Sequence, residues 1–564
     1  MMRLGHAARA LVPQRWNFWS VVTVAGLVVF IVLLIIPLGQ LVISSFADRE
    51  GTFSADEDFG VLATYVEFFS FPYYYQTLLN SFYVSALATL FAVLIGFPTA
   101  YLVNRYDLPG KLLIRVSIVL TFVSPPFIGA YAWVLLLGRS GVITGWLANV
   151  GISVPSIYGW RGIVLVFTLQ AFPFVFLLVS AGLRSIDQSI EDAATNLGRP
   201  VIGVIRTALV PLLIPAISTG ALLVFVTTFA DFGTPMIIGE GYRVLATLIY
   251  TEFINEFGGN PRRASTFSLL LLTITVGALL IQRWFAARRS FGQESVRPLG
   301  IRTLPPGKRL AASLFVYGVV FTAFLPSFTV IVSSFLESQG PMLLASFSID
   351  GYREALRLPL ALRNTLVFVS TATVIAVTAG ALIGYVIVRR PGRIAALLDT
   401  MSMVPYAVAG VVLGVALSLA FGGPPFLLAG TGAILVLAYF IRRLPYSVRS
   451  VSGMLQQVGV QTEEASINLG VPPGRTFWRI TVPQITPAIL SGALLTWATT
   501  AREFNATVML YSGRTRTLPV EVFAQVLQGN FGAASVVGTV LIVVTVVPIV
   551  ILFKVFGKDE EVLV

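Results

Sequence analysis

Long apolar runs separated by short polar segments dominate the chain, and each run is long enough to cross about 30 Å of hydrocarbon as a helix. The first six runs fall near residues 18–44, 79–104, 112–137, 160–183, 212–234 and 264–286. The other six fall near residues 310–334, 364–388, 396–421, 430–452, 484–508 and 534–556. The pattern therefore predicts an all-α membrane protein with about 12 transmembrane helices in two groups of six.

The composition supports this fold class. Hydrophobic residues make up 56% of the 564 residues and charged residues 11%, with a mean hydropathy of +0.86, which is far outside the range of soluble globular proteins. The net charge of +12 would favour a nucleic-acid partner in a soluble chain. Here the basic residues flank apolar runs and set membrane orientation, so we expect contact with membrane lipid and no nucleic acid.

Soft metal ligands are scarce. The chain has no cysteine and a single histidine, His6, which precedes the first apolar run. Thiolate and imidazole metal sites within the membrane are thereby excluded. Whether the protein binds a metal is left unknown, but any bound metal would need oxygen ligands or would arrive already chelated.

Two constant offsets show that the chain is an internal duplication. An offset of 272 relates Glu191, Gly198, Pro211 and Pro215 to Glu463, Gly470, Pro483 and Pro487. An offset of 284 relates Asn80, Gly96, Tyr101 and Arg105 to Asn364, Gly380, Tyr385 and Arg389. We predict a first repeat over 1–287, a linker over 288–309 and a second repeat over 310–564, with the repeats parallel because each has an even number of spans.

The basic residues predict the orientation. They cluster before the first run and in the loops after the second and eighth, at Arg3, Arg9, Arg15, Arg105, Lys111, Arg115, Arg389, Arg390 and Arg393. If that side is cytosolic, both chain termini, the linker and the duplicated loops at residues 186–217 and 458–489 are cytosolic as well.

The duplicated loops resemble the EAA loop of ABC importer permeases, which reads Glu-Ala-Ala, three residues, Gly, nine residues, Ile, any residue, Leu-Pro. The second copy follows this spacing from Glu464 through Gly470 to Pro483, whereas the first has Asp192 in place of the glutamate and Ala208 in place of the isoleucine. Acidic and small residues followed by glycine favour a short helix that another surface can approach closely. The resemblance implies ATPase coupling through Glu191, Asp192, Ala193, Ala194, Gly198, Glu463, Glu464, Ala465 and Gly470.

Charged residues at membrane depth are the second set of candidates, because they are costly there and often functional. They are Asp231, Arg442, Arg443, Arg502 and Glu503. One interpretation places them along a translocation path near its outer gate. The other has Arg502 and Glu503 in an inter-helix pair or in the headgroup zone, with the arginines reaching toward the headgroups. Three arginines against two acids would suit an anionic solute or an anion-chelated metal.

Nearly the whole chain resembles the fused 12-span permeases of type I ABC importers. The ferric iron permease group is the most similar, through residues 230–234, 438–445 and 502–504. The resemblance implies alternating-access uptake across a bacterial cytoplasmic membrane, served by two ATPase copies and a periplasmic or lipid-anchored solute-binding protein. The chain itself is then no enzyme and needs no catalytic residue or cofactor, because ATP and Mg²⁺ bind the ATPase. Its Gly-Lys pairs at Gly110, Gly307 and Gly557 are not followed by Ser or Thr, so they lack the phosphate-binding motif.

Other interpretations stay open. Related permeases carry phosphonate, sugar phosphate, thiamine or polyamine. A different class, an ion-gradient-driven secondary transporter with two parallel groups of six helices, also accounts for the number of spans. It does not explain why the best duplicated segments are loops between the fourth and fifth spans of each half.

Overall fold

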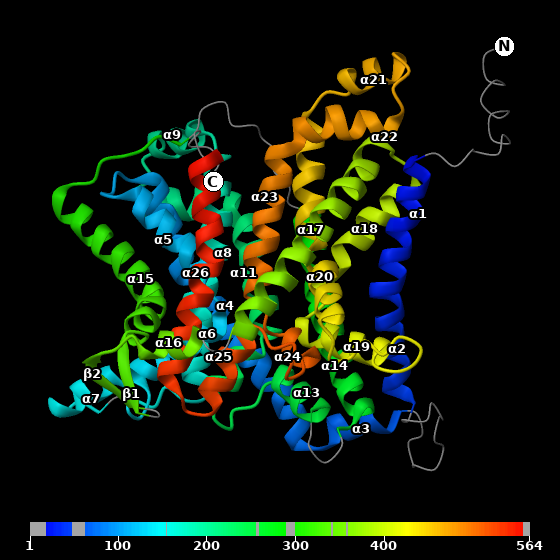
Figure 1. The fold of residues 1–564 in the computed structure, drawn as a ribbon. Coiled ribbons are helices and arrows are strands. Elements are labelled where there is room, and N and C mark those ends of the chain that lie inside the picture. The colour runs from blue at the N-terminus through cyan, green and yellow to red at the C-terminus, as the bar shows by residue number, and fades with distance from the viewer. Residues whose placement is uncertain are drawn as a thin grey trace. The chain divides into compact units, whose positions relative to one another are not determined.

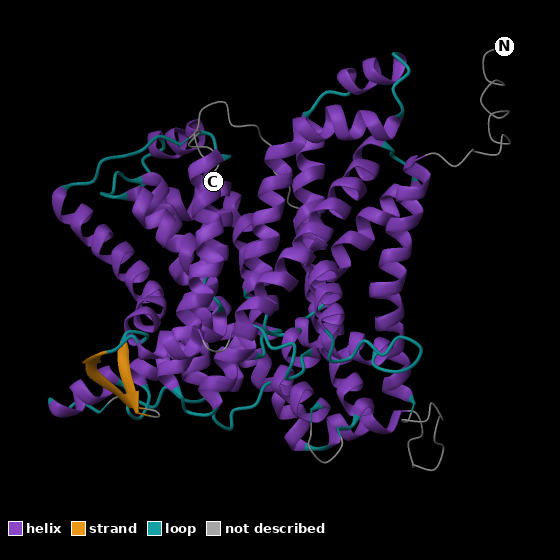
Figure 2. Ribbon diagram, viewed as in Figure 1, coloured by secondary structure: helices purple, strands orange, loops and turns teal. Residues whose placement is uncertain are grey.

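The computed structural model describes residues 18–47, 62–153, 155–254, 259–288, 299–339, 342–356 and 359–556. Helices account for most of them, and the strands in this part of the chain form a two-stranded sheet (Figure 2). The predicted all-α fold class is confirmed. The chain divides into two compact units: unit 1 comprises Met1–Ile36, Ser370–Tyr406 and Tyr439–Trp497, and unit 2 comprises Pro37–Val369, Ala407–Ala438 and Ala498–Val564.

The elements are named in chain order, with η marking π-helical segments. Up to residue 288 they are α1 (Phe18–Phe30), η2 (Ile31–Ile35), α2 (Ile36–Phe46), α3 (Ala63–Ser70), α4 (Pro72–Arg105), α5 (Lys111–Val123), α6 (Pro126–Leu137), α7 (Val142–Asn149), α8 (Trp160–Arg184), α9 (Gln188–Asn196), α10 (Val201–Val204), η4 (Ile205–Leu209), α11 (Val210–Phe229), α12 (Gly233–Ile238), α13 (Leu245–Phe253) and α14 (Pro261–Arg288).

The remaining elements begin after the linker. They are α15 (Pro306–Ser333), β1 (Leu336–Gln339), β2 (Met342–Phe347), α16 (Asp350–Leu356), α17 (Pro359–Arg389), α18 (Arg393–Ala407), α19 (Gly410–Phe421), α20 (Gly432–Gln457), α21 (Gln461–Asn468), α22 (Pro473–Thr476), η5 (Phe477–Thr481), α23 (Val482–Ala501), α24 (Thr507–Leu510), α25 (Leu518–Leu527) and α26 (Phe531–Phe556). Strands β1 and β2 pair antiparallel.

Within the described residues, 10 helices are long and apolar enough to cross a membrane, or up to 11 if α18 and α19 form one broken span. Helix α20 is 26 residues long, which is enough to cross, but it carries three arginines and is not among these helices. The predicted runs 112–137 and 396–421 are both interrupted. In the first, Pro125 lacks an N–H donor and disfavours helix at Ser124, so α5 ends before it.

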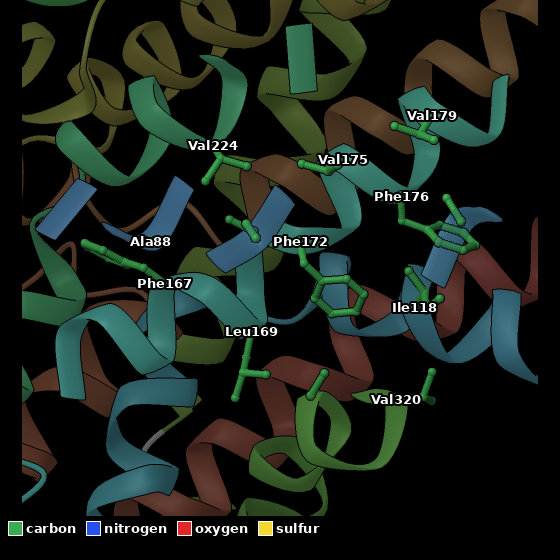
Figure 3. Close-up of a cluster of buried hydrophobic side chains, with 14 of the residues drawn as sticks. Ala88, Ile118, Phe167, Leu169, Phe172, Val175, Phe176, Val179, Val224 and Val320 are labelled. Carbon is green, nitrogen blue, oxygen red and sulfur yellow. The ribbon is translucent and has the colours of Figure 1, made fainter. Parts of the chain in front are cut away.

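Helices α4, α8 and α11 form the centre of unit 2. Their apolar side chains interdigitate, among them the buried Ala88, Phe172, Val175 and Val224 (Figure 3). Helices α4 and α8 also lead to the first duplicated loop, since α4 ends at Arg105 and α8 ends at Arg184, shortly before α9. The packing therefore fixes the two helix ends between which α9 lies.

In unit 1, three aromatic rings pack together beside the second duplicated loop. Trp19 of α1 stacks on Tyr385 of α17, with ring centroids 4.0 Å apart and planes at 14°. The ring of Phe477, in η5, meets both of these rings edge-on. Trp19 is 2% exposed, so this contact ties α1 to the segment that carries the second duplicated loop.

Candidate functional site

Each duplicated loop folds into a short helix that a glycine ends. Helix α9 begins after Asp187, whose carboxylate accepts a hydrogen bond from the Ser189 backbone N–H at 2.9 Å. Gly198 follows α9 with φ +76°, and Gly470 follows α21 with φ +85°. Residues with a Cβ rarely adopt these angles, so glycine is required where each helix stops.

The first acid of the first loop points inward. Glu191 is 1% exposed, and its carboxylate forms an ion pair with Arg105, at the end of α4. Its other oxygen lies 3.0 Å from the Arg302 guanidinium. Glu191 therefore holds α9 against the end of α4 and cannot present its charge to another protein in this arrangement.

The second loop is anchored in the same way by a related set of residues. Glu463 is 2% exposed; it accepts a hydrogen bond from the Tyr385 hydroxyl at 2.8 Å and lies 3.3 Å from Arg389 Nε. Arg389 also donates to the Val458 carbonyl at 2.7 Å. Because Arg389 and Arg105 are duplicates, both repeats join their loop to the end of their second long helix through an Arg–Glu pair.

The other predicted coupling residues of α9 and α21 are more exposed than Glu191 and Glu463. Asp192 is half-buried and accepts a hydrogen bond from the Gln188 side chain at 2.8 Å. Ala194 is half-buried, whereas Ala193, Glu464 and Ala465 are exposed. The exposed residues of α9 are small or polar, whereas those of α21 also include Ile467 and Glu464, which adds a negative charge.

Within each loop a π-helical segment follows the short helix, α9 or α21, at the same place in the repeat. Segments η4 (Ile205–Leu209) and η5 (Phe477–Thr481) begin 272 positions apart. Each is followed two residues later by a proline, Pro211 or Pro483, which has no N–H to donate to the preceding turn. Single π turns inside α-helices often occur at functional sites, and here they join the loops to α11 and α23.

Three of the predicted path residues lie where the long helices end. Helix α11 ends at Phe229 and α23 at Ala501, so the runs predicted over 212–234 and 484–508 extend too far. Asp231 accepts a hydrogen bond from the Thr234 N–H at 2.9 Å, and Glu503 accepts one from the Ala506 N–H at 3.1 Å. These carboxylates make duplicate turns that satisfy backbone donors near the starts of α12 and α24.

Aromatic rings close around these turns. The Phe504 ring centroid lies 4.8 Å from that of Phe127, 5.0 Å from Phe523 and 5.6 Å from Phe232. A Cβ on Gly233 would lie 3.0 Å from both Phe127 and Phe504, so this turn has little room for a side chain. We call Phe127, Phe232, Phe504 and Phe523 the aromatic cluster; Phe232 and Phe504 are duplicates, 272 positions apart.

Polar contacts accompany the aromatic cluster. The Asn505 side chain donates to Asp231 at 3.2 Å, which joins the turn of the first repeat to that of the second. Arg502 donates to the carbonyls of Phe122 and Ser124, the latter at 3.4 Å, and its guanidinium lies 5.3 Å from the Phe122 ring centroid. Arg502 therefore satisfies carbonyl groups at the end of α5, where Pro125 interrupts the helix.

The remaining two candidates, Arg442 and Arg443, belong to a different unit. They lie in the part of α20 assigned to unit 1, whereas Asp231, Arg502 and Glu503 lie in unit 2. Both arginines are half-buried, and the Arg443 guanidinium lies 5.9 Å from the Tyr446 ring centroid. The structure thus brings together the three candidates beside the aromatic cluster and places these two arginines on a separate element.

Comparison with known protein families separates the remaining interpretations. The model of the family described as "Binding-protein-dependent transport system inner membrane component" matches residues 88–291 and 372–559. The two matches together cover more than half of the chain, and the first extends four residues past the predicted end of the first repeat at 287. The chain belongs to this family. The predicted importer permease is confirmed, and the ion-gradient-driven carrier is not favoured.

Individual members of the family agree with two repeats. The chain is 28% identical to the ferric transport system permease protein FbpB of Actinobacillus pleuropneumoniae over 540 residues, covering 92% of this chain and 76% of that protein. It is 25% identical over 501 residues to the Fe(3+)-transport system permease protein FbpB 2 of Haemophilus influenzae, covering 87% and 92%. The molybdenum transport system permease protein ModB of Escherichia coli is 30% identical over 217 residues, which is 93% of ModB but 38% of this chain.

Membership defines what the protein is in general terms. It is a multi-pass inner-membrane permease of an ABC importer, and it works with an ATPase and a solute-binding protein. The chain is not an enzyme, since ATP hydrolysis belongs to the separate ATPase subunit.

The structure also reveals two exposed leucines that sequence reasoning missed. Leu197 is 83% exposed and Leu469 is 85% exposed, each directly before the glycine that ends its helix. A large apolar side chain in so exposed a place costs solvation free energy unless a partner covers it. The signal was present in the sequence, because these leucines are 272 positions apart and interrupt polar segments, but only the structure shows that they are exposed.

Proposed function

We propose that this chain is the permease of an ATP-driven importer of ferric iron, carried free or as an anion chelate. The proposal is based on the relatives named as ferric or Fe(3+) transport permeases, which align with 87–92% of this chain. An alignment over both repeats includes the candidate path as well as the coupling loops. Arg442, Arg443 and Arg502 support an anion-chelated form, because guanidinium groups pair well with carboxylate and phosphate oxygens.

In this proposal two ATPase copies dock on the cytosolic side, one on α9 and one on α21. Leu197 and Leu469 would enter apolar pockets of the ATPases, while small residues such as Ala193 and Ala465 allow close approach. A partner that covers such a side chain removes apolar surface from water, which contributes favourably to the binding free energy. ATP and Mg²⁺ would bind the ATPases, and the permease would need no cofactor of its own.

The buried ion pairs provide the mechanical link. When the ATPases close on ATP, each would move its loop, and the loop would move α4 through Glu191–Arg105 or α17 through Glu463–Arg389. Gly198, Gly470 and the π-helical segments would act in this mechanism as the joints between loop and span. Both chain termini and the linker would lie in the cytosol on the same side as the loops.

At the other end, the aromatic cluster would be the outer gate. Its closed packing, with Asp231 and Glu503 holding the turns, would block the path until the ATPases close. A periplasmic or lipid-anchored binding protein would then release its solute to the open path. Arg442 and Arg443, on α20, would be further path residues.

Transport by a reconstituted complex tests the proposed substrate. Liposomes that contain the permease and its ATPase should take up radioactive ferric iron when the binding protein is loaded with iron and ATP is inside. Uptake should stop without ATP or without the binding protein. If the complex instead takes up molybdate, a phosphonate, a sugar phosphate, thiamine or a polyamine and leaves iron outside, the importer function stands and the iron assignment is wrong.

A further inference from the structure

The described end of the linker between the repeats is bound to the first coupling loop. The Arg302 backbone N–H donates to the Arg105 carbonyl at 2.9 Å, and the Asp107 N–H donates to the Arg302 carbonyl at 3.1 Å. These bonds make a parallel bridge between Tyr106 and Arg302. The linker around Arg302 therefore runs in extended form beside the end of α4, the helix end that also holds α9.

The same segment contacts α9 at two points. The Gly300 N–H donates to the Gln188 side chain at 3.0 Å, and the Arg302 guanidinium lies 3.0 Å from Glu191. Gln188 and Glu191 are three residues apart, close to one helical turn. The linker thus lies along the first turn of α9, and Figure 1 shows the coil before α15 reaching that helix. Leu299 and Leu304 pack against the core of unit 2 on either side of this contact.

This attachment leaves an apolar side chain facing outward. In an extended segment, neighbouring side chains point to opposite sides. Arg302 turns inward to Glu191, and Ile301 is 65% exposed. Hydrogen bonds on both sides of Ile301 fix its backbone, so the side chain cannot turn inward without breaking them.

Ile301 and Leu197 are close enough to contact one partner. Leu197 directly follows α9 and is nine positions after Gln188, a rise of about 14 Å at 1.5 Å per residue. A typical protein interface covers about 800 Å² on each partner, or roughly 30 Å across. An ATPase seated on α9 would therefore also cover the linker segment.

We propose that linker residues 299–303 form part of the first ATPase docking surface, with Ile301 as an apolar contact beside α9. The inference depends on the proposed docking of an ATPase on α9. The first docking surface then combines residues of the linker with the loop of the first repeat. Arg302 has a positioning role in this surface, since it joins the linker to Glu191 inside the loop.

Cysteine labelling tests the composite surface. The chain contains no cysteine, so Ile301→Cys and Leu197→Cys each introduce a single thiol into the full-length permease. Ile349→Cys is the matched control, because Ile349 is an exposed isoleucine, 44% accessible, next to α16 at the end of unit 2 opposite α9 (Figure 1). Each variant is placed in lipid nanodiscs, and the rate of reaction with a membrane-impermeant maleimide is measured without and with the ATPase subunit.

The proposal expects the ATPase to slow labelling of Cys at positions 301 and 197 at least tenfold and to leave the control at position 349 unchanged. Protection at position 197 without protection at 301 overturns the composite surface and leaves docking on α9 intact. Equal labelling at both positions with and without the ATPase overturns the docking itself. If position 301 is already unreactive before the ATPase is added, lipid or the chain covers it, and the inference is wrong.

Discussion

Adjacent acidic residues in the second coupling loop have opposite surroundings. Glu463 is buried between Tyr385 and Arg389, whereas Glu464 is exposed on α21. Both acids stand in the first turn of a short helix, and the resemblance to the EAA loop assigned both to ATPase coupling. The direction each one faces depends on how α21 is rotated against the end of α17, and tertiary packing sets that rotation.

This difference predicts separate effects for the two acids. Glu463→Gln removes the countercharge of Arg389, whose side chain is 14% exposed, and should cost about 2 kcal/mol of stability, the value typical of hydrogen bonds to charged groups. Glu464→Gln should change stability by less than about 0.5 kcal/mol, as is usual for exposed positions. Thermal unfolding of the purified variants measures both effects.

The roles should reverse when partner binding is measured. Glu464→Lys should weaken ATPase binding while the unfolding temperature stays that of the wild type. Equal losses of stability in Glu463→Gln and Glu464→Gln would show that the buried pair does not anchor the loop.

At the level of elements, helix ends were the least predictable feature. The apolar runs continued through Phe232 and Phe504, because hydropathy does not detect where a helix stops. The available signal was the spacing: Asp231 precedes Thr234, and Glu503 precedes Ala506, by three residues, which is typical of side chains that cap a following turn. The contact between Phe232 and Phe504 is absent from any local pattern, since it joins turns that are 272 positions apart.

The proposed role of the aromatic cluster as the outer gate can be tested by mutation. Phe504→Ala removes the ring that contacts Phe127, Phe232 and Phe523, and buried Phe→Ala changes cost about 3–5 kcal/mol. If even 1.4 kcal/mol of this favours the closed state over the open one, the open population rises about tenfold. The reconstituted complex should then hydrolyse ATP several-fold faster in the absence of binding protein.

Phe71→Ala is the control for the gate experiment. Phe71 is 56% exposed and lies outside the aromatic cluster, so its removal should leave the basal ATPase rate unchanged. A Phe504→Ala variant that folds, assembles with the ATPase and keeps the wild-type basal rate would contradict the assignment of the gate.

At the level of the whole molecule, the two compact units do not follow the two sequence repeats. Trp19 belongs to the predicted first repeat, yet it stacks on Tyr385 and meets Phe477, which belong to the second. Constant offsets report shared ancestry and therefore predicted the duplication, while the apolar runs predicted the spans. Compactness depends on which helices touch, and the offsets carry no information about that. The limits 1–287, 288–309 and 310–564 stay a prediction.

The two coupling loops predict how many ATPases one chain can hold. Leu197 lies in unit 2 and Leu469 in unit 1, so each loop should bind its own ATPase copy. Placing a charge in an apolar contact of this kind should cost at least 2 kcal/mol, about 30-fold in affinity.

Native mass spectrometry of the detergent-extracted complex should find two ATPase copies on the wild type, fewer on Leu197→Asp or Leu469→Asp, and none on the double variant at the same protein concentration. Leu527→Asp changes a leucine that is 56% exposed at the end of α25 and is part of neither loop, and it should retain both copies. Two copies on the double variant would mean that the exposed leucines do not carry the docking, whereas one copy on the wild type would mean that the loops are not equivalent docking sites.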